Sequence, residues 1–253
     1  MGAFEGRHVV VTGGGVGIGR AIAERLGREG AALSLLAPNL DELGEVAARV
    51  GGDAHFCDIR DRASVDSAFG AAAASRGPVH ALVANSGIGG PNADGPDDRF
   101  AEILETNLFG TYWCVRAAER HLAPGPERRD VVVIASILAR IAVPGYSAYS
   151  ASKAGLLGLV RSLSAELAPA NVQVNAVCPG WVETNMAWQG IDALVDATGM
   201  TREEAVADVL KAVPLGRMGQ PEEIAGTVAY LLSPDAGGVT GQAIDQNGGA
   251  WTG

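Results

Sequence analysis

The chain has 253 residues, of which 47% are hydrophobic, and a formal net charge of −10 at pH 7. This length and composition predict a single α/β domain over residues 1–253 with a sizeable core, and they exclude an intrinsically disordered chain. The acidic balance argues against nucleic acid or an anionic membrane as a partner, because bulk electrostatics oppose both contacts.

Seven short apolar runs predict β-strands. They cover residues 8–12, 32–36, 54–57, 80–84, 130–135, 172–178 and 242–245. Each run is almost continuously apolar rather than alternating, which is typical of strands that are buried on both faces of a parallel sheet.

Helical patterns separate these runs. They cover residues 17–29, 41–50, 63–75, 98–121, 148–167 and 221–232. Pro221 followed by Glu222 and Glu223 indicates a helix start, because proline fits the first turn and acids favour the positive end of the helix dipole. The repeated strand–helix–strand order predicts a Rossmann-like, doubly wound parallel sheet with right-handed crossovers.

One long insertion, at about residues 183–214, interrupts this order. It contains helical patterns at residues 191–197 and 201–212, and Thr201 with Glu204 forms a capping-box pattern. Long excursions of this kind often cover an active site, so we expect a helical substrate lid here.

The first predicted strand ends in a glycine-rich turn, which runs Thr-Gly-Gly-Gly-Val-Gly-Ile-Gly from Thr12 to Gly19. Open α/β sheets bind dinucleotides where such a turn leads into a helix. Glycines let the backbone approach a pyrophosphate, and the helix N-terminus offers N–H groups and a partial positive charge. The spacing G-x-x-x-G-x-G differs from the commoner G-x-G-x-x-G. Taken alone, the pattern also fits a tight turn without a ligand.

A tyrosine and a lysine, Tyr149 and Lys153, lie one turn apart on the predicted helix 148–167. A free tyrosine titrates near ~10, and a neighbouring ammonium favours the phenolate and lowers that pKa. The pair therefore suits general acid–base catalysis near neutral pH. Ser136 follows the strand 130–135, at the end of a parallel strand that faces the ligand crevice.

Together these motifs resemble the short-chain dehydrogenase/reductase superfamily. Further matches extend the resemblance to residue 249: Asn107 in the helix 98–121, Asn85 and Gly87 in an Asn-Asn-Ala-Gly-like turn, Pro179 and Gly180 after the sixth strand, and the segments 217–223 and 240–249. The chain departs from the family turn at Ala84 and Ser86.

The resemblance implies four catalytic residues: Asn107, Ser136, Tyr149 and Lys153. Ser136 is expected to bind the carbonyl oxygen, and Tyr149 to give it a proton in the reduction direction. Lys153 is expected to tune Tyr149 and to hold the nicotinamide ribose. Asn107 is expected to order a water that extends the proton relay. The hydride chemistry belongs to the cofactor.

The resemblance also implies a binding site for a nicotinamide dinucleotide. Asp58 is expected to meet the adenine, and the segment after Pro179 the nicotinamide carboxamide. The residues expected to hold the cofactor are Gly13, Gly17, Ile18, Gly19, Asn39, Asp58, Ile59, Asn85, Gly87, Tyr149, Lys153, Pro179, Gly180, Val182 and Thr184.

The residues after the second strand favour NAD over NADP. An acid at this place binds the 2′-hydroxyl of NAD, and a nearby arginine accepts the 2′-phosphate of NADP. Here Ala37 occupies the acid's place and Pro38 the arginine's, and the glycine turn has no basic residue. An unpaired phosphate beside an apolar wall is costly. Asn39 suits either cofactor, and Arg60 is a cation that could approach the phosphate.

The substrate is expected to be a small hydrophobic or cyclic alcohol or ketone, because Trp181 and Trp188 in the lid and Leu138 after Ser136 are large and apolar. Packing of the two tryptophans within the lid is an equal alternative. The lid resembles those of hydroxyacyl dehydrogenases and polyketide ketoreductases, which makes an NADPH-dependent 3-oxoacyl or polyketide ketoreductase the alternative function. A cofactor-binding scaffold without activity is disfavoured, because all four catalytic positions are filled.

The remaining expectations concern chemistry and location. Cys57, Cys114 and Cys178 are widely spaced and predict buried thiols in a reducing compartment, and neither they nor the four histidines suit a metal site. No signal peptide and no apolar run of about 18 residues is present, which predicts a cytoplasmic protein without a membrane span. The family resemblance implies a homotetramer.

Overall fold

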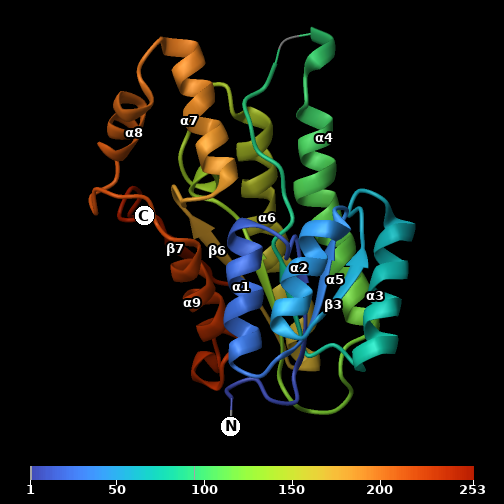
Figure 1. Cartoon of the computed structure of the whole chain (residues 1–253). Helices are drawn as coiled ribbons and strands as arrows, with labels where there is room; N and C mark the ends of the chain where they lie inside the picture. Colours follow the sequence, from blue (N-terminus) through green and yellow to red (C-terminus); the bar gives the residue numbers. More distant parts are fainter. Residues whose placement is uncertain (1, 94) are drawn as a thin grey trace.

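A computed structural model describes residues 2–93 and 95–253 of the chain. Its centre is a seven-stranded parallel sheet with the strand order β3-β2-β1-β4-β5-β6-β7 (Figure 1). The strands are β1 (His8–Thr12), β2 (Ala32–Ala37), β3 (Asp53–Phe56), β4 (Ala81–Ala84), β5 (Arg129–Ile134), β6 (Val172–Pro179) and β7 (Ala243–Gln246). All seven predicted strands are confirmed, with ends that shift by at most two residues because apolar runs do not mark the last ladder hydrogen bond.

Helices cover both faces of the sheet. The longer ones are α1 (Gly17–Arg28), α2 (Leu40–Val50), α3 (Arg62–Arg76), α5 (Thr111–Arg120), α6 (Ser147–Leu167) and α9 (Pro221–Leu232). Helices α1, α2 and α9 pack on one face, and α3, α5 and α6 on the other. The predicted doubly wound architecture is therefore confirmed.

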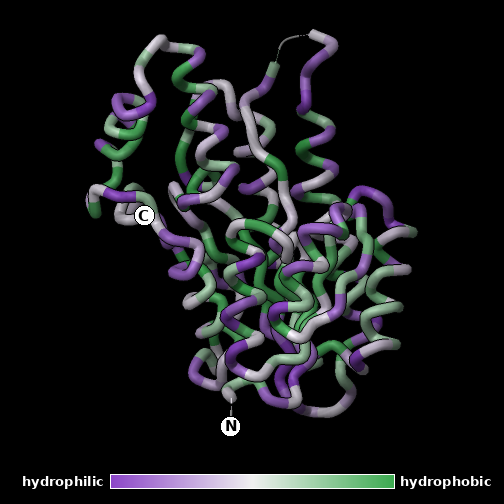
Figure 2. Tube along the Cα trace, viewed as in Figure 1, coloured by the Kyte–Doolittle hydropathy of each residue, from purple (hydrophilic) through white to green (hydrophobic). Residues whose placement is uncertain are grey.

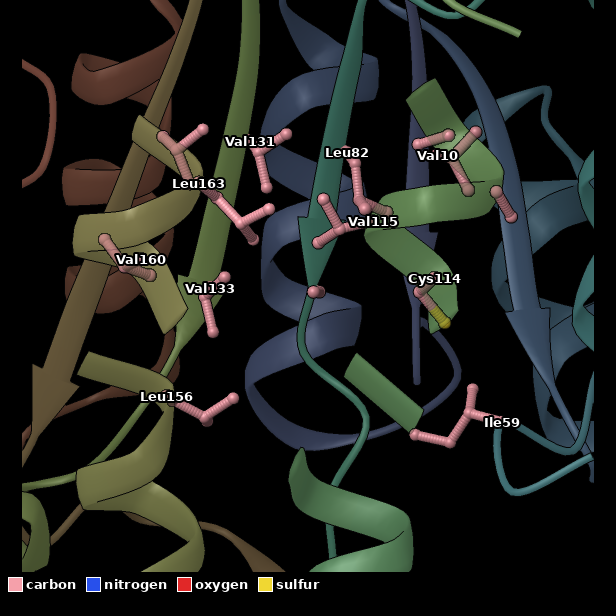
Figure 3. Close-up of a cluster of buried hydrophobic side chains, with 14 of the residues drawn as sticks. Val10, Ile59, Leu82, Cys114, Val115, Val131, Val133, Leu156, Val160 and Leu163 are labelled. Atoms are coloured by element: carbon pink, nitrogen blue, oxygen red, sulfur yellow. The ribbon is translucent and has the colours of Figure 1, made fainter. Parts of the chain in front are cut away.

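Successive residues of the inner strands face opposite layers. In β1, Val9 and Val11 pack toward α1 and α9, whereas Val10 packs toward α3, α5 and α6. Apolar segments accordingly concentrate around the sheet, while polar segments dominate the outer turns of the helices (Figure 2). Figure 3 shows the second layer, in which Val131 and Val133 of β5 face side chains of α6. Burial on both faces explains the continuously apolar strands.

The predicted helix 98–121 is confirmed as a continuous helical stretch over residues 100–120. It consists of α4 (Phe100–Leu104), a wider π-type segment η2 (Glu105–Gly110) and α5. At the end of η2, a Cβ on Gly110 would lie 2.7 Å from Ile59 Cγ1, so the wide turn packs closely on a residue of the loop after β3. Wide turns of this kind are frequent at functional sites, and apolar periodicity does not reveal them because one extra residue barely disturbs it.

The insertion folds into α7 (Asn185–Thr198) and α8 (Arg202–Leu210), which rise beyond the carboxyl ends of the strands (Figure 1). Helix α7 begins six residues before the expected residue 191, because Thr184 caps it by accepting a hydrogen bond from the Ala187 N–H. The capping box of Thr201 and Glu204 at α8 is confirmed.

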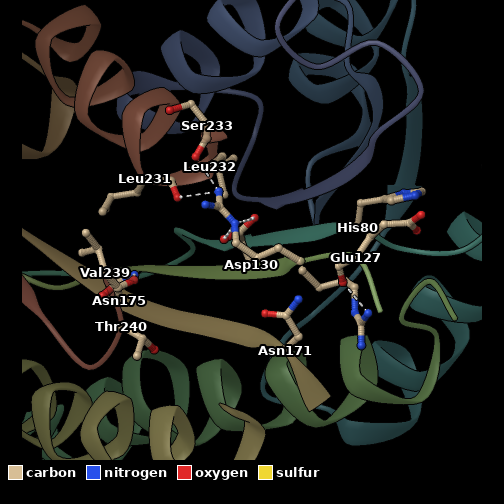
Figure 4. A network of polar contacts seen from close by, with 12 residues as sticks. His80, Glu127, Asp130, Asn171, Asn175, Leu231, Leu232, Ser233, Val239 and Thr240 are labelled. Carbon is tan, nitrogen blue, oxygen red and sulfur yellow. Dashed lines mark hydrogen bonds and ion pairs between the residues drawn. The ribbon is translucent and has the colours of Figure 1, made fainter. Parts of the chain in front are cut away.

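An ionic network fixes the opposite, amino end of the sheet (Figure 4). The buried Asp130 carboxylate lies 2.6 Å from the Arg7 guanidinium and 3.0 Å from that of Arg128. Arg128 also donates to the Ser233 carbonyl just beyond α9. The network thus ties α9 to β5 far from the glycine turn. Within residues 2–93 and 95–253, no helix combines the length and hydrophobicity needed to cross a bilayer.

Candidate active site

The glycine turn between β1 and α1 has the backbone geometry that an anion-binding turn needs. Gly13 has a φ of 66°, which favours glycine. A Cβ on Gly19 would collide with the Gly13 carbonyl oxygen, so the turn closes only without side chains. In the described structure, no side chain caps α1. The first N–H groups of this 12-residue helix therefore remain available for an anion.

Asn85 joins this turn to the end of β4. Its side-chain amide donates to the carbonyl oxygens of Thr12 at 3.1 Å and of Gly13 at 3.2 Å. The Thr12 hydroxyl in turn accepts from the Asn85 and Ser86 N–H groups, each at 3.0 Å. The chain thus uses polar side chains to hold two neighbouring strand ends at the switch point of the sheet, where ligands bind in such folds.

The four predicted catalytic residues converge beside this junction. The buried Lys153 ammonium donates to the Ile134 carbonyl at 2.9 Å, at the end of the strand that leads to Ser136. It lies 5.6 Å from the centre of the Tyr149 ring. Tyr149 is in the first turn of α6, and Lys153 follows one turn later, as their spacing predicted.

Asn107, in η2, braces the group from the other side. It is fully buried, and its side-chain amide donates to the Ser152 hydroxyl at 3.1 Å. It also exchanges two hydrogen bonds with the backbone of Ile88, at 2.8 and 2.9 Å. A Cβ on Gly87 would lie 3.1 Å from Asn107 Oδ1 and 3.5 Å from Lys153 Nζ. The absence of a side chain at Gly87 therefore lets the β4 loop approach both residues.

Burial dominates the protonation chemistry of the group. It lowers the pKa of Lys153 to about 8 and raises the pKa of Tyr149 above its ordinary value. The Ser136 side chain opposes the shift at Tyr149, because it stabilises the phenolate. A tyrosine in this state keeps its proton at neutral pH, which suits a proton donor.

The segment after β6 approaches both the glycine turn and the end of β7. A Cβ on Gly17 would lie 3.3 Å from Thr184 Cγ2, so the start of the lid touches the start of α1. A Cβ on Gly180 would lie 2.9 Å from Asn247, and the Gly180 N–H donates to the Gln246 carbonyl. These contacts place the predicted residues from Pro179 to Thr184 between the glycine turn and the lid.

Near the ends of β2 and β3, three predicted residues have side chains already engaged. The side-chain oxygen Oδ1 of Asn39 caps α2 by accepting from the Asp41 and Glu42 N–H groups. Asp58 is paired with Arg60, which lowers the pKa of this carboxyl. The side chain of Ile59 packs in the core, so only its backbone can face a ligand (Figure 3).

Packing in the lid favours the second of the two expectations for the tryptophans, in which they pack within the lid. Trp181 and Trp188 pack against a small cluster around Ile191, and the Arg202 guanidinium stacks 4.8 Å from the Trp188 ring centre. Among the described residues, the large apolar lid side chain near the catalytic group is instead Met186. It is 45% exposed, and its sulfur would lie 3.3 Å from a Cβ on Gly89, which would also lie 3.7 Å from Tyr149 Cε2.

The described groups fit a nicotinamide dinucleotide. A cradle that side chains would fill lies at an uncapped helix N-terminus, and a lysine and a tyrosine lie near the ends of β4 and β5 beside it. Sequence reasoning missed the bracing roles of Thr12 and Ser152 and the place of Met186 near the catalytic group. Only Thr12 had a signal, its place directly before the glycine turn.

Comparisons with known proteins agree with this geometry. A family model described as enoyl-(acyl carrier protein) reductase matches residues 14–250. A candidate ketoacyl reductase from Streptomyces coelicolor is 38% identical over 262 residues, covering 98% of each chain. The 3-oxoacyl-(acyl-carrier-protein) reductase FabG of Escherichia coli is 34% identical over 252 residues, also covering 98% of each chain. A solved structure of an actinorhodin polyketide ketoreductase variant with NADPH matches with 35% identity and a TM-score of 0.90, covering 96% of this chain and 97% of that one.

Proposed function

The chain belongs to the short-chain dehydrogenase/reductase superfamily of oxidoreductases, which act on CH–OH and keto groups, and we propose that it interconverts a hydrophobic secondary alcohol and its ketone with Tyr149 as acid and base. One observation carries the proposal. Lys153, Tyr149 and Ser136 gather where β4, β5 and α6 meet, next to a glycine turn that suits a dinucleotide.

In the reduction direction, the Ser136 hydroxyl binds the carbonyl oxygen, and the Tyr149 hydroxyl donates its proton to that oxygen. A bound reduced nicotinamide supplies the hydride. Lys153 stabilises the phenolate that remains on Tyr149 and holds the ribose hydroxyls. The Asn107 side-chain amide donates to the Ser152 hydroxyl, next to Lys153, and to the Ile88 carbonyl. These two bonds fix the helix that carries Lys153 against the loop after β4. In the oxidation direction, the same groups act in reverse.

Met186 supports a hydrophobic substrate. Its side chain lies near Gly89, on the side of the catalytic group that faces the lid, and the residue is 45% exposed. Burying such a side chain against an apolar substrate is favourable. Residues 183–214 then serve as a lid whose inner contact with the substrate comes from Met186, while Trp181 and Trp188 hold the lid helices together.

Charge near the end of β2 supports NADH as the preferred cofactor. Ala37 and Pro38 carry no charge, Asp41 and Glu42 add negative charge at the start of α2, and Arg60 is paired with Asp58. A 2′-phosphate would therefore lack a free cation here. The second candidate is an NADPH-dependent 3-oxoacyl or polyketide ketoreductase, which the solved relative with NADPH favours.

Activity is tested by following oxidation of the reduced nicotinamide with a bicyclic ketone, a 3-oxoacyl thioester and acetone. We expect turnover with the first two and little with acetone, because the small ketone leaves Met186 uncovered. A preference for the 3-oxoacyl thioester together with NADPH supports the second candidate. Absence of oxidation with every ketone and both cofactors contradicts the proposed function.

The cofactor preference is tested by placing an arginine at the uncharged position after β2. Pro38→Arg is expected to tighten NADPH binding by about 10-fold, because a charge-assisted hydrogen bond contributes about 1.5 kcal/mol. NADH binding should change little, and Pro38→Ala serves as the control for loss of the proline ring. Fluorescence titration with both cofactors measures the effect. Tighter binding of NADPH than NADH to the native protein contradicts the preference.

A further inference from the structure

The first turn of α6, which carries Tyr149, has no cap from its own sequence. Tyr146 occupies the N-cap position, and its side chain makes no capping hydrogen bond. Helices usually satisfy these first N–H groups with a Ser, Thr, Asp or Asn at the N-cap. The position of a catalytic side chain in an uncapped first turn therefore depends on contacts from elsewhere in the chain.

Asn92, from the loop after β4, supplies these contacts. Its side-chain oxygen accepts from the Ala148 N–H at 3.1 Å and from the Ser147 hydroxyl at 3.0 Å. Its own N–H donates to the Gly145 carbonyl at 2.6 Å. Three hydrogen bonds thus join Asn92 to residues 145–148, just before Tyr149, and the two that its side chain accepts span 55 and 56 positions of the sequence.

The loop that ends in Asn92 is fixed at both ends. At its start, Ile88 exchanges two hydrogen bonds with the Asn107 side chain. Between them lies Gly89, where a Cβ would be 3.7 Å from Tyr149 Cε2. We name residues 88–92 the strap. The strap runs from the Asn107 side chain to the first turn of α6, which carries Tyr149, and at Gly89 it passes so near the tyrosine ring that an added Cβ would be in van der Waals contact with it.

A second residue, Asp98, links the strap to the start of α4. Its carboxylate accepts from the Asn92 amide at 3.2 Å and from the Phe100 N–H at 3.1 Å. Asn92 therefore connects the N-terminus of α4, which leads to Asn107, with the N-terminus of α6, which carries Tyr149. Its amide acts as a donor on one side and as an acceptor on the other, which a non-polar side chain cannot replace.

We propose that Asn92 is a positioning residue that sets Tyr149 for proton transfer by capping α6 from the strap. The inference rests on the proposed function. Loss of the cap lets the first turn of α6 fray and moves the Tyr149 hydroxyl relative to Ser136. A displacement near 1 Å costs a reaction about 100-fold, so Asn92→Ala is expected to lower kcat by about 10- to 100-fold. The KM of the cofactor, bound mainly by the glycine turn, should change little.

The test compares Asn92→Ala with a reciprocal exchange, Asn92→Asp with Asp98→Asn. The exchange keeps an acceptor for Ser147 and Ala148 and reverses the hydrogen bond between positions 92 and 98. Both native bonds to Asp98 use Oδ1, so the amide at position 98 must turn for its oxygen to accept from Phe100 while its nitrogen donates to the carboxylate at position 92. We expect it to restore kcat.

Deuterium on the transferred position of the nicotinamide should give a larger isotope effect on kcat in Asn92→Ala, because chemistry becomes slower than product release. Asp61→Ala, which removes the cap of α3, is the matched control and should lose stability without losing kcat.

Amide hydrogen exchange of the first turn of α6 gives a readout that does not depend on catalysis. We expect faster exchange there in Asn92→Ala and native exchange in the reciprocal double variant. Unchanged exchange, or a kcat that the double variant fails to restore, overturns the proposal. If the native protein reduces no ketone, the proposed function fails, while the exchange measurement still decides whether Asn92 holds the turn that carries Tyr149.

Discussion

Replacing Tyr149 with phenylalanine is expected to lower kcat by about 10³-fold or more, within the range that a lost general acid costs. The ring keeps its place 5.6 Å from the Lys153 ammonium, so only the hydroxyl that donates the proton is removed. Ser136 can still bind the carbonyl oxygen, but a serine hydroxyl is a much weaker acid than a phenol. Cofactor binding should remain nearly native, because the glycine turn is untouched.

Single-turnover kinetics and cofactor titration measure these two effects separately. Tyr146→Phe is the matched control, because it removes a partly buried tyrosine hydroxyl three residues earlier and should leave kcat near native. A Tyr149→Phe variant that retains native kcat shows that another group donates the proton. A variant that loses cofactor binding as well shows that Tyr149 acts mainly on the cofactor.

Replacing Lys153 with methionine is expected to raise stability while it lowers kcat by about 10²-fold or more, since it removes the charge that stabilises the phenolate. Burial lowers the pKa of Lys153 from 10.5 to about 8, and its residue is only 4% exposed. One pKa unit corresponds to about 1.4 kcal/mol, so the buried ammonium costs on the order of 3 kcal/mol at pH 7. The variant also loses the hydrogen bond to the Ile134 carbonyl, which costs about 1 kcal/mol of stability. The free energy of unfolding is therefore expected to rise by about 2 kcal/mol in total.

The pH dependence of this gain has a definite sign. The folded state has the lower pKa, so between about 8 and 10.5 the unfolded state binds more protons and native stability rises with pH. The advantage of Lys153→Met should be full below pH 8 and should vanish toward pH 10.5. Urea unfolding at several pH values measures it, with the exposed Lys211→Met as control. A variant less stable than the native protein at pH 7 contradicts this explanation.

The sequence predicted the sheet and the catalytic group because both depend on local patterns. Continuous apolar runs identify parallel strands, and the spacing of Tyr149 and Lys153 on one helix fixes their relative position. Ser136 was placed correctly because it follows a strand directly. Residues at strand ends meet at one edge of such a sheet, so their proximity follows from the strand order.

Local sequence patterns did not predict the contacts between segments that lie far apart in the sequence. The capping of α6 by Asn92 needs a loop conformation that no periodicity encodes, and the pairing of Arg60 with Asp58 decides whether that cation is free. The wide turn at Asn107 ends where Gly110 approaches Ile59 closely, and this approach between two elements has no local sequence pattern. The roles assigned to the site residues, the single-domain boundaries and the homotetramer stay predictions.

The central claim is direct hydride transfer to a carbonyl carbon within this site. The most direct measurement uses a reduced nicotinamide that carries deuterium at C4, with mass spectrometry of the alcohol formed from a bicyclic ketone. We predict one deuterium on the carbinol carbon of the product from the native protein, and almost no product from Tyr149→Phe. A carbinol hydrogen that comes from solvent, or label that stays on the cofactor while alcohol accumulates, contradicts the claim.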